Sequence, residues 1–148
     1  KYPNEISFNA VLSALAKNAK RDPMAPVKAE QLMQEMDHLA DRFPHLRPTI
    51  FSYNAVLEAH AKNCNSGNPK RSQQSKLAIL RIFRKVQRDD HLQPNTFTNN
   101  LLLSCNARSS IEWQVVEQWA LEYFDHPTSM SVQPDRNTYN QLFQCYAI

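Results

Sequence analysis

The chain has 148 residues, and 17 lysine and arginine residues against 14 acidic residues give a formal net charge of +3. This length is typical of a single domain, and an apolar fraction of 42% is enough to form a core. The only glycine, Gly67, argues against all-β folds with glycine turns, dinucleotide-binding fingerprints and phosphate-binding loops. The composition therefore predicts an all-helical protein, and no apolar run is long enough to span a membrane.

Four segments of the chain repeat one pattern. Each has a proline six residues before an Asn, and a Ser or Thr two residues before that Asn. The prolines are Pro3, Pro48, Pro94 and Pro134, which lie 45, 46 and 40 residues apart. Self-similarity with such a period is typical of repeat architectures. We therefore divide the chain into the units 3–47, 48–93, 94–133 and 134–148, the last of them incomplete.

Each proline precedes the expected start of a first helix. The next residue has a side-chain oxygen that can accept a hydrogen bond from a free backbone N–H group, as N-cap residues do. These residues are Asn4, Thr49, Asn95 and Asp135. Apolar residues then follow at helical spacing, as Phe8, Leu12 and Leu15 do in the first unit. The pattern predicts one helix after each proline.

A second apolar stripe predicts a partner helix in each complete unit. The stripes contain Met33, Phe83 and Phe124. The polar stretches Lys17–Ala25 and Asn63–Ser75 lie between the paired helices and are predicted to be loops. Each unit is therefore expected to be a helical hairpin, and the hairpins to stack into an α-solenoid of about three and a half repeats. Because the fourth unit contains only one helix, we expect the chain to be part of a longer array.

The segment Phe8–Lys17 (FNAVLSALAK) and its copy Tyr53–Lys62 (YNAVLEAHAK) resemble the first helix of pentatricopeptide repeats. The segment Lys28–Met36 (KAEQLMQEM) resembles the second helix of that family. The resemblance covers nearly the whole chain, although these units are longer than usual because of additional residues between the two helices. Tetratricopeptide repeats are the nearest alternative, but no glycine occurs in any first helix here.

The resemblance implies binding of single-stranded RNA, with one base per unit. In the family, a base is selected by the Asn of one unit together with the residue after the next unit's proline. These positions are Asn9 with Thr49, Asn54 with Asn95, Asn100 with Asp135, and Asn140, whose partner would follow Ile148. In the family, a pair of two Asn residues favours cytosine, whose N3 accepts a hydrogen bond. A pair of Asn and Asp favours uracil, whose N3–H donates one. The implied preference is pyrimidine–C–U–pyrimidine.

Both sets of positions have another interpretation. The residues after the prolines are sufficiently explained as N-caps, although a cap can still contact RNA. The inner Asn residues can make a structural hydrogen bond instead of contacting a base. Asn is a mediocre helix former, however, and it occupies this position in all four units.

The resemblance assigns two further roles. Residues three positions before each base-selecting Asn would flank the base, or else they belong to the hairpin core. They are Ile6, Phe51, Phe97 and Asn137. Residues eight positions after it would contact phosphates, or else they are solvated side chains near a helix end. They are Lys17, Lys62 and Arg108. A denser basic group within Lys70–Arg88 is interpreted as a solvated outer face.

The cysteines and histidines indicate no catalytic or metal site. Cys64, Cys105 and Cys145 are odd in number and include no CxxC pair, so we expect neither a disulfide framework nor zinc. Cys105 and Cys145 match small residues of the other units and are expected to be packed. The five histidines lack metal-ligand spacing. The sequence therefore predicts no enzymatic activity, no cofactor and no small-molecule substrate.

Together these observations predict a segment that binds single-stranded RNA. By resemblance, it would act in RNA processing, stability, editing or translation in a mitochondrion or plastid. The alternative is a protein-binding helical scaffold, either tetratricopeptide-like or ribosome-associated, with other proteins as its partners. Loss of affinity for RNA when Asn54 or Asn100 is replaced would distinguish the first function from the second.

Overall fold

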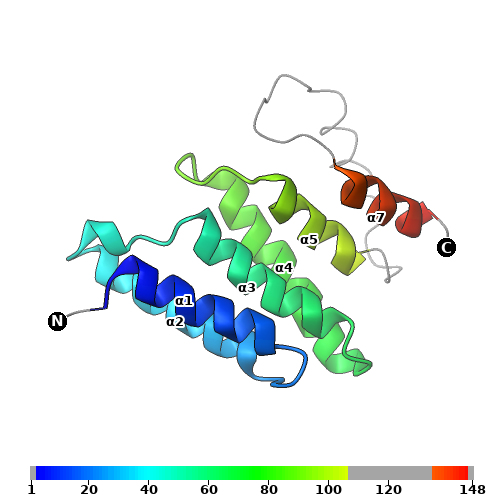
Figure 1. The fold of residues 1–148 in the computed structure, drawn as a ribbon, viewed down its shortest axis with the longest axis horizontal. Helices are drawn as coiled ribbons and strands as arrows, with labels where there is room; N and C mark the ends of the chain where they lie inside the picture. The colour runs from blue at the N-terminus through cyan, green and yellow to red at the C-terminus, as the bar shows by residue number, and fades with distance from the viewer. Residues whose placement is uncertain (1–2, 107–134, 147–148) are drawn as a thin grey trace.

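A computed structural model of the chain describes residues 3–106 and 135–146, and the secondary structure of these residues is entirely helical (Figure 1). The elements are α1 (Glu5–Asn18), α2 (Ala25–Ala40), the short 3₁₀ helix η1 (Pro44–Leu46), α3 (Ile50–Cys64), α4 (Pro69–Arg88), α5 (Thr96–Asn106) and α7 (Arg136–Tyr146). The prediction of an all-helical protein is confirmed for this part of the chain. Within it, no helix has the length and apolar character needed to cross a membrane. Phe124 and Arg108 lie outside the described residues.

The residue after the motif's proline caps the following helix in three units. Its side-chain oxygen accepts the backbone N–H of the third residue along, at 2.9, 2.9 and 2.8 Å. These caps are Asn4, Asn95 and Asp135. Thr49 occupies the same place before α3 and forms a capping box with Ser52, but its Oγ1 is buried and makes no hydrogen bond of ordinary geometry among the described residues. One unit therefore starts its first helix differently from the others.

The two predicted loops are shorter than expected. Most of Asn63–Ser75 is helical, because α3 continues to Cys64 and α4 already begins at Pro69. The side chain of Asn68 caps α4, and a proline suits the first helical position because the N–H that it lacks would have no partner there. Gly67, with a φ of +73°, makes the tight turn between the helices. The first loop is likewise reduced to residues 19–24.

The helices that follow the prolines pack one on the next. Helix α1 contacts α3, α3 contacts α5, and α5 contacts α7, while α2 and α4 each pack against their own hairpin partner. Figure 1 shows α1, α3, α5 and α7 following one another across the molecule. Leu12, Leu57 and Val86, which belong to three different helices, are fully buried in one continuous core. Burying such a side chain contributes about 2 kcal/mol, so neighbouring hairpins stabilise each other.

A disulfide links Cys64 at the end of α3 to Cys105 in α5, with the two Cα atoms 5.9 Å apart. The expectation that the cysteines form no disulfide is therefore wrong. The odd number of cysteines was a poor guide, because the pairing depends on which helices pack together, and these two residues are 41 positions apart. Cys105 is buried, as expected for a small packed position.

Candidate functional site

The predicted base-selecting residues lie where the first helix of one unit meets the first helix of the next, and each group includes a Ser or Thr. We call these groups seams. Seam one contains Asn9, Thr49 and Ser52; seam two contains Asn54, Asn95 and Thr98; seam three contains Asn100, Asp135 and Thr138. In each seam the hydroxyl of the later unit donates to the Asn Oδ1 of the earlier unit, at 2.8, 2.7 and 2.8 Å. The inner Asn residues thus do make the structural hydrogen bond that the sequence left as an alternative.

The seam hydroxyls also hold the start of their own helix. Each accepts the backbone N–H of the residue after the proline, at 3.2, 3.2 and 3.1 Å in seams one, two and three. A hydroxyl has one proton to donate, and the Asn Oδ1 is its nearest acceptor. The three hydroxyl residues are almost completely buried, with exposed fractions of 0, 0 and 1%. One side chain therefore connects the start of a helix to the preceding hairpin.

In seam two the hydrogen bonds determine which way the cap amide points. The Oδ1 of Asn95 accepts the backbone N–H of Thr98 at 2.9 Å and faces the Nδ2 of Asn54 at 3.5 Å. Its oxygen is therefore directed at the protein, and its NH₂ group has no partner among the described residues. Seam two thus offers a hydrogen-bond donor to a ligand.

Seam three has the same arrangement but offers an acceptor. The Oδ1 of Asp135 accepts from the backbone N–H of Thr138 at 2.8 Å and from the Nδ2 of Asn100 at 3.1 Å. These bonds, the backbone one first, lower the pKa of Asp135 below its ordinary value. The side chain is therefore a carboxylate at neutral pH, and its second oxygen remains available as an acceptor.

Seam one differs from the other two. The Nδ2 of Asn9 is directed to Glu5, at 3.4 Å from Oε1, instead of to the residue after the next proline. The Oγ1 of Thr49 is buried. Seam one therefore presents no polar group from Thr49 to a ligand. In α7, Asn140 is exposed.

The residues predicted to flank a base are exposed. Ile6, Phe51 and Phe97 are 76, 72 and 50% exposed, which excludes the alternative that they are core residues. Asn137 is exposed as well. Residues three apart in a helix lie on the same face, so each of these side chains is next to the Asn of its own unit. Large exposed apolar side chains beside each seam are suited to stack on a planar ligand.

The predicted phosphate contacts are placed differently from one another. Lys17 is exposed at the end of α1 and makes no ion pair with the described residues. Lys62 donates from Nζ to the backbone oxygen of Ala16 at 2.8 Å and pairs with Glu58 at 2.7 Å, so it holds the end of α1. A cavity of about 780 Å³ brings Lys62 together with Phe97. Lys20 and Arg71 also line this cavity and add positive charge.

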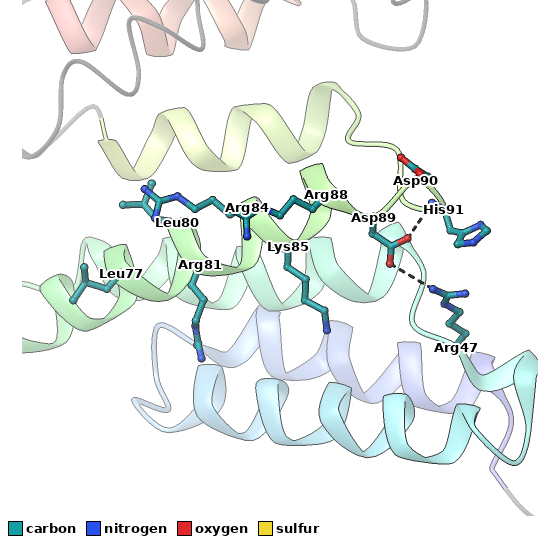
Figure 2. A pocket seen from close by; sticks show the side chains of 10 residues that line it. All are labelled: Arg47, Leu77, Leu80, Arg81, Arg84, Lys85, Arg88, Asp89, Asp90 and His91. Atoms are coloured by element: carbon teal, nitrogen blue, oxygen red, sulfur yellow. Dashed lines mark hydrogen bonds and ion pairs between the residues drawn. The ribbon is translucent and has the colours of Figure 1, made fainter.

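The basic group on α4 lies apart from the seams. Figure 2 shows Arg81 and Lys85 directed toward α2, where they pair with Glu30 at 2.6 Å and Asp37 at 3.0 Å. Arg84 is exposed and makes no ion pair with the described residues. A cavity of about 760 Å³ runs along this side of α4, and no seam residue lines it. Most of this group is exposed, as predicted, but Arg81 and Lys85 join α4 to α2, and Arg71 lines the cavity beside Lys62.

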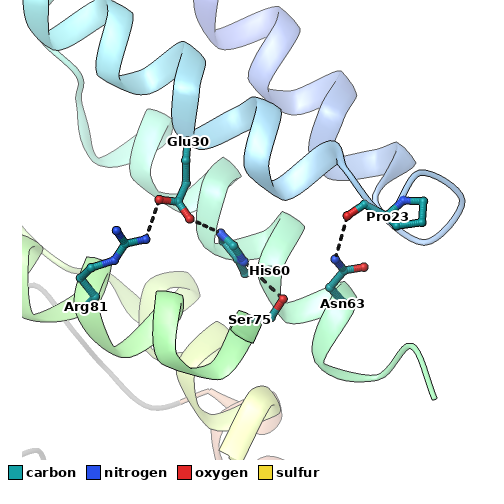
Figure 3. Close-up of polar contacts among 6 residues, drawn as sticks. All are labelled: Pro23, Glu30, His60, Asn63, Ser75 and Arg81. Atoms are coloured by element: carbon teal, nitrogen blue, oxygen red, sulfur yellow. Dashed lines mark hydrogen bonds and ion pairs between the residues drawn. The ribbon is translucent and has the colours of Figure 1, made fainter. Parts of the chain in front are cut away.

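Sequence reasoning missed a polar cluster between α2, α3 and α4 (Figure 3). His60, which is 5% exposed, lies 2.7 Å from Oε1 of Glu30 through Nε2 and 3.3 Å from Oγ of Ser75 through Nδ1. Arg81 binds the other oxygen of Glu30. Ser75 is 3% exposed and lies inside α4. Backbone N–H groups inside a helix are already hydrogen-bonded and cannot stabilise an oxyanion, so the geometry around Ser75 does not favour a catalytic serine. The cluster therefore joins three helices.

No group of three or more His, Cys, Asp or Glu side chains within residues 3–106 and 135–146 could hold a metal ion. Comparison of the chain with protein-family models, with curated proteins and with solved structures gives no match.

Proposed function

We propose that the hairpins stack as an α-solenoid that binds single-stranded RNA, with one base at each seam. The observation that carries this proposal is the repeated seam geometry. The same three residue positions meet in the same way at seams two and three, yet one seam presents an amide donor and the other a carboxylate acceptor. A structural role alone requires the shared hydrogen bonds but not a different outward group in each seam.

The outward groups favour pyrimidines. The free NH₂ of Asn95 complements N3 and O2 of cytosine, which are acceptors, whereas the free carboxylate oxygen of Asp135 complements the N3–H of uracil. Thr49 supplies no such group, so selection at seam one is expected to be weak. The proposed site, 5′ to 3′, is pyrimidine–C–U–pyrimidine, with three bases at the three seams, the fourth beside the exposed Asn140 of α7, and most of the discrimination in the two central positions.

Stacking and charge complete the proposed interface. Phe51 and Phe97 are exposed beside seams two and three, where base stacking on an aromatic ring contributes about 1–3 kcal/mol per base. Lys17 is exposed at the end of α1, and Lys20 and Arg71 line the cavity that also contains Lys62 and Phe97, so these cations would face the phosphates. The resemblance to pentatricopeptide repeats adds an expected setting, the processing, stability, editing or translation of mitochondrial or plastid RNA.

The proposal is tested by fluorescence anisotropy with labelled RNAs that differ in one central base. The wild-type chain should prefer U-C-U-U over U-U-U-U by about tenfold, because a matched polar contact discriminates by at least about 1 kcal/mol. Asn95→Asp should reverse this preference, and Asp135→Asn should shift the third base from uracil to cytosine. Arg84→Gln, on the far side of α4, serves as the control and should change neither preference.

Two results would contradict the proposal. Salt-dependent binding without base preference would indicate only an electrostatic groove. Absence of RNA binding would favour the protein-binding scaffold, and the exposed aromatic residues beside the seams would then belong to a protein interface.

A further inference from the structure

We infer that Thr98 and Thr138 are positioning residues for base selection, although neither faces the ligand. This inference rests on the proposed function. Each hydroxyl is buried behind its seam, and we propose that it determines which end of the neighbouring Asn amide is presented to the base. Discrimination would then depend on three residues per seam and not on two.

The hydrogen-bond inventory of seam two supports a single amide orientation. Thr98 Oγ1 accepts the backbone N–H of Asn95 at 3.2 Å, and its single proton goes to Asn54 Oδ1 at 2.7 Å, the nearer of two acceptors, the other being Asn95 Oδ1 at 3.0 Å. Asn54 can then direct only its NH₂ group toward the Oδ1 of Asn95. If the amide of Asn54 were reversed, two carbonyl oxygens would face each other at that distance. The hydroxyl and the cap oxygen thus select the same orientation from opposite sides.

Burial makes this selection strong. Asn54 is only 5% exposed, so water cannot replace the donor that its Oδ1 would lose. In seam three the same bond joins Thr138 to Asn100 at 2.8 Å, and the cap oxygen there belongs to a carboxylate. A reversed Asn100 amide would place its carbonyl oxygen against a negative charge. The amide orientation is therefore determined from two sides in each of these seams. The hydroxyl residue and the Asn that it orients lie 44 residues apart in the sequence in seam two and 38 residues apart in seam three.

Removing the hydroxyl should release the amide without changing either base-contacting residue. Thr98→Val has nearly the same shape but donates nothing, whereas Thr98→Ser keeps the hydroxyl and loses only a methyl group. With valine, the buried Oδ1 of Asn54 loses its donor, and only the contact of 3.5 Å between its Nδ2 and the Oδ1 of Asn95 still favours the original orientation. The base would then meet a mixture of Asn54 orientations beside the NH₂ group of Asn95, so the preference for cytosine over uracil should fall.

The experiment compares two affinity ratios within one variant. In Thr98→Val, the preference for U-C-U-U over U-U-U-U should fall from about tenfold to less than about twofold. The preference at the third base, measured as U-C-U-U against U-C-C-U, should stay unchanged. Thr98→Ser should restore the second-base preference, and Thr138→Val should show the mirror result, a loss at the third base only.

A merely structural role would lower affinity for all these RNAs equally, and that result would overturn the inference. Thr98→Val with intact second-base preference would overturn it too. If Thr98→Val does not fold, as judged by circular dichroism, Thr138→Val and its serine counterpart decide the same question.

A measurement without RNA separates failure of this inference from failure of the proposed function. The side-chain NH₂ resonances of Asn54 in the wild-type chain should report a rigid amide by ¹⁵N relaxation, and Thr98→Val should make it mobile. A rigid Asn54 amide in that variant would overturn the inference even if RNA binds. A mobile amide in a chain that binds no RNA would refute the proposed function while supporting the positioning of Asn54 by Thr98.

Discussion

The junction between the first and second units and the junction between the second and third units are held together by different chemistry. At the first junction, Glu30 and Asp37 of α2 pair with Arg81 and Lys85 of α4, and Glu30 also binds His60. At the second junction, α3 and α5 are joined by a disulfide. The seam hydrogen bond between hydroxyl and Asn occurs at both.

The seam bond is common to both junctions, whereas the other links between neighbouring helices differ from one junction to the next. Ion pairs and a disulfide are interchangeable ways of holding neighbouring helices, whereas the seam bond is present wherever two units meet. Cap chemistry varies as well, because Asn95 completes its seam and Thr49 does not. Conditions that weaken one junction should therefore leave the other intact.

The largest effect is expected from removing the disulfide. Cys64→Ala should lower the free energy of unfolding by about 2–4 kcal/mol, because the unfolded chain loses a cross-link. Urea denaturation monitored by circular dichroism measures this change. A reducing agent should lower the midpoint of the wild-type chain to a similar extent and have no effect on Cys64→Ala. An unchanged wild-type midpoint in reductant would contradict the prediction.

The next largest effect concerns the ionic junction. Glu30→Gln should cost about 1–3 kcal/mol at neutral pH, because it weakens the bonds of Glu30 to buried His60 and to Arg81. The hydrogen bond from His60 is the main cause that lowers the pKa of Glu30 below its ordinary value of 4.5, and the charge of Arg81 contributes, while burial opposes both.

The sign of the pH dependence follows from this lowered pKa. The folded chain keeps Glu30 ionised to a lower pH than the unfolded chain does, so its contribution is complete above about pH 4.5 and is lost as the pH falls through the folded pKa. Urea midpoints from pH 7 to pH 3 should therefore converge for the wild type and Glu30→Gln. Glu35→Gln, on the exposed side of α2, is the matched control and should follow the wild type throughout.

A smaller gain is expected at Asn99. This residue stands where the other first helices have Phe8, Tyr53 and Tyr139, yet it is 3% exposed and its Oδ1 has no hydrogen-bond partner among the described residues. Asn99→Leu should raise the free energy of unfolding by about 1 kcal/mol, because an unsatisfied polar group is replaced by an apolar one. Thermal unfolding monitored by circular dichroism measures this gain. Asn99→Asp should lower the free energy of unfolding in the same experiment, since it buries a charge.

The smallest effect is expected when seam one is converted to the type of seam two. In Thr49→Asn, the new Oδ1 should accept the backbone N–H of Ser52 and face the amide of Asn9, which should add about 0.5–1 kcal/mol. Thermal unfolding measures the gain, and anisotropy should show a new cytosine preference at the first base. The reverse change, Asn95→Thr, should remove the preference at the second base. Equal selectivity in all three chains would show that the cap does not select the base.

Local signals in the sequence predicted where the first helix of each unit begins. They failed where contacts between distant residues determine the structure. A proline, a cap and helical spacing lie within a few residues of one another, and α1, α3, α5 and α7 begin where they indicate. The first turns of α4 look like a loop because their residues are polar, and the buried face begins only at Ser75. Capping by Asn68 and the favourable helix propensity of Lys, Arg and Gln extend the helix in front of that face.

Contacts between residues far apart in the sequence explain the features of the structure that were not predicted. The Ser or Thr before each Asn was visible as part of the repeated pattern, but Ser52 binds a residue 43 positions earlier, so its role could not be assigned from spacing. The bond between His60 and Glu30 spans 30 positions and crosses helices that only the fold brings together. The exposure of Phe51 and Phe97 also depends on how the hairpins pack, which left their two interpretations open.

The seam bond also determines where one exchangeable module of this protein ends and the next begins. Each Asn depends on a hydroxyl supplied by the following hairpin, so a cut at the proline separates residues that act together. A hairpin transplanted from proline to proline would bring a cap and hydroxyl suited to a different neighbour. For recombination between such proteins, the portable block runs from the middle of one first helix to the middle of the next, and the breakpoint belongs between the Ser or Thr and the Asn two residues after it, so that each Asn stays with its hydroxyl.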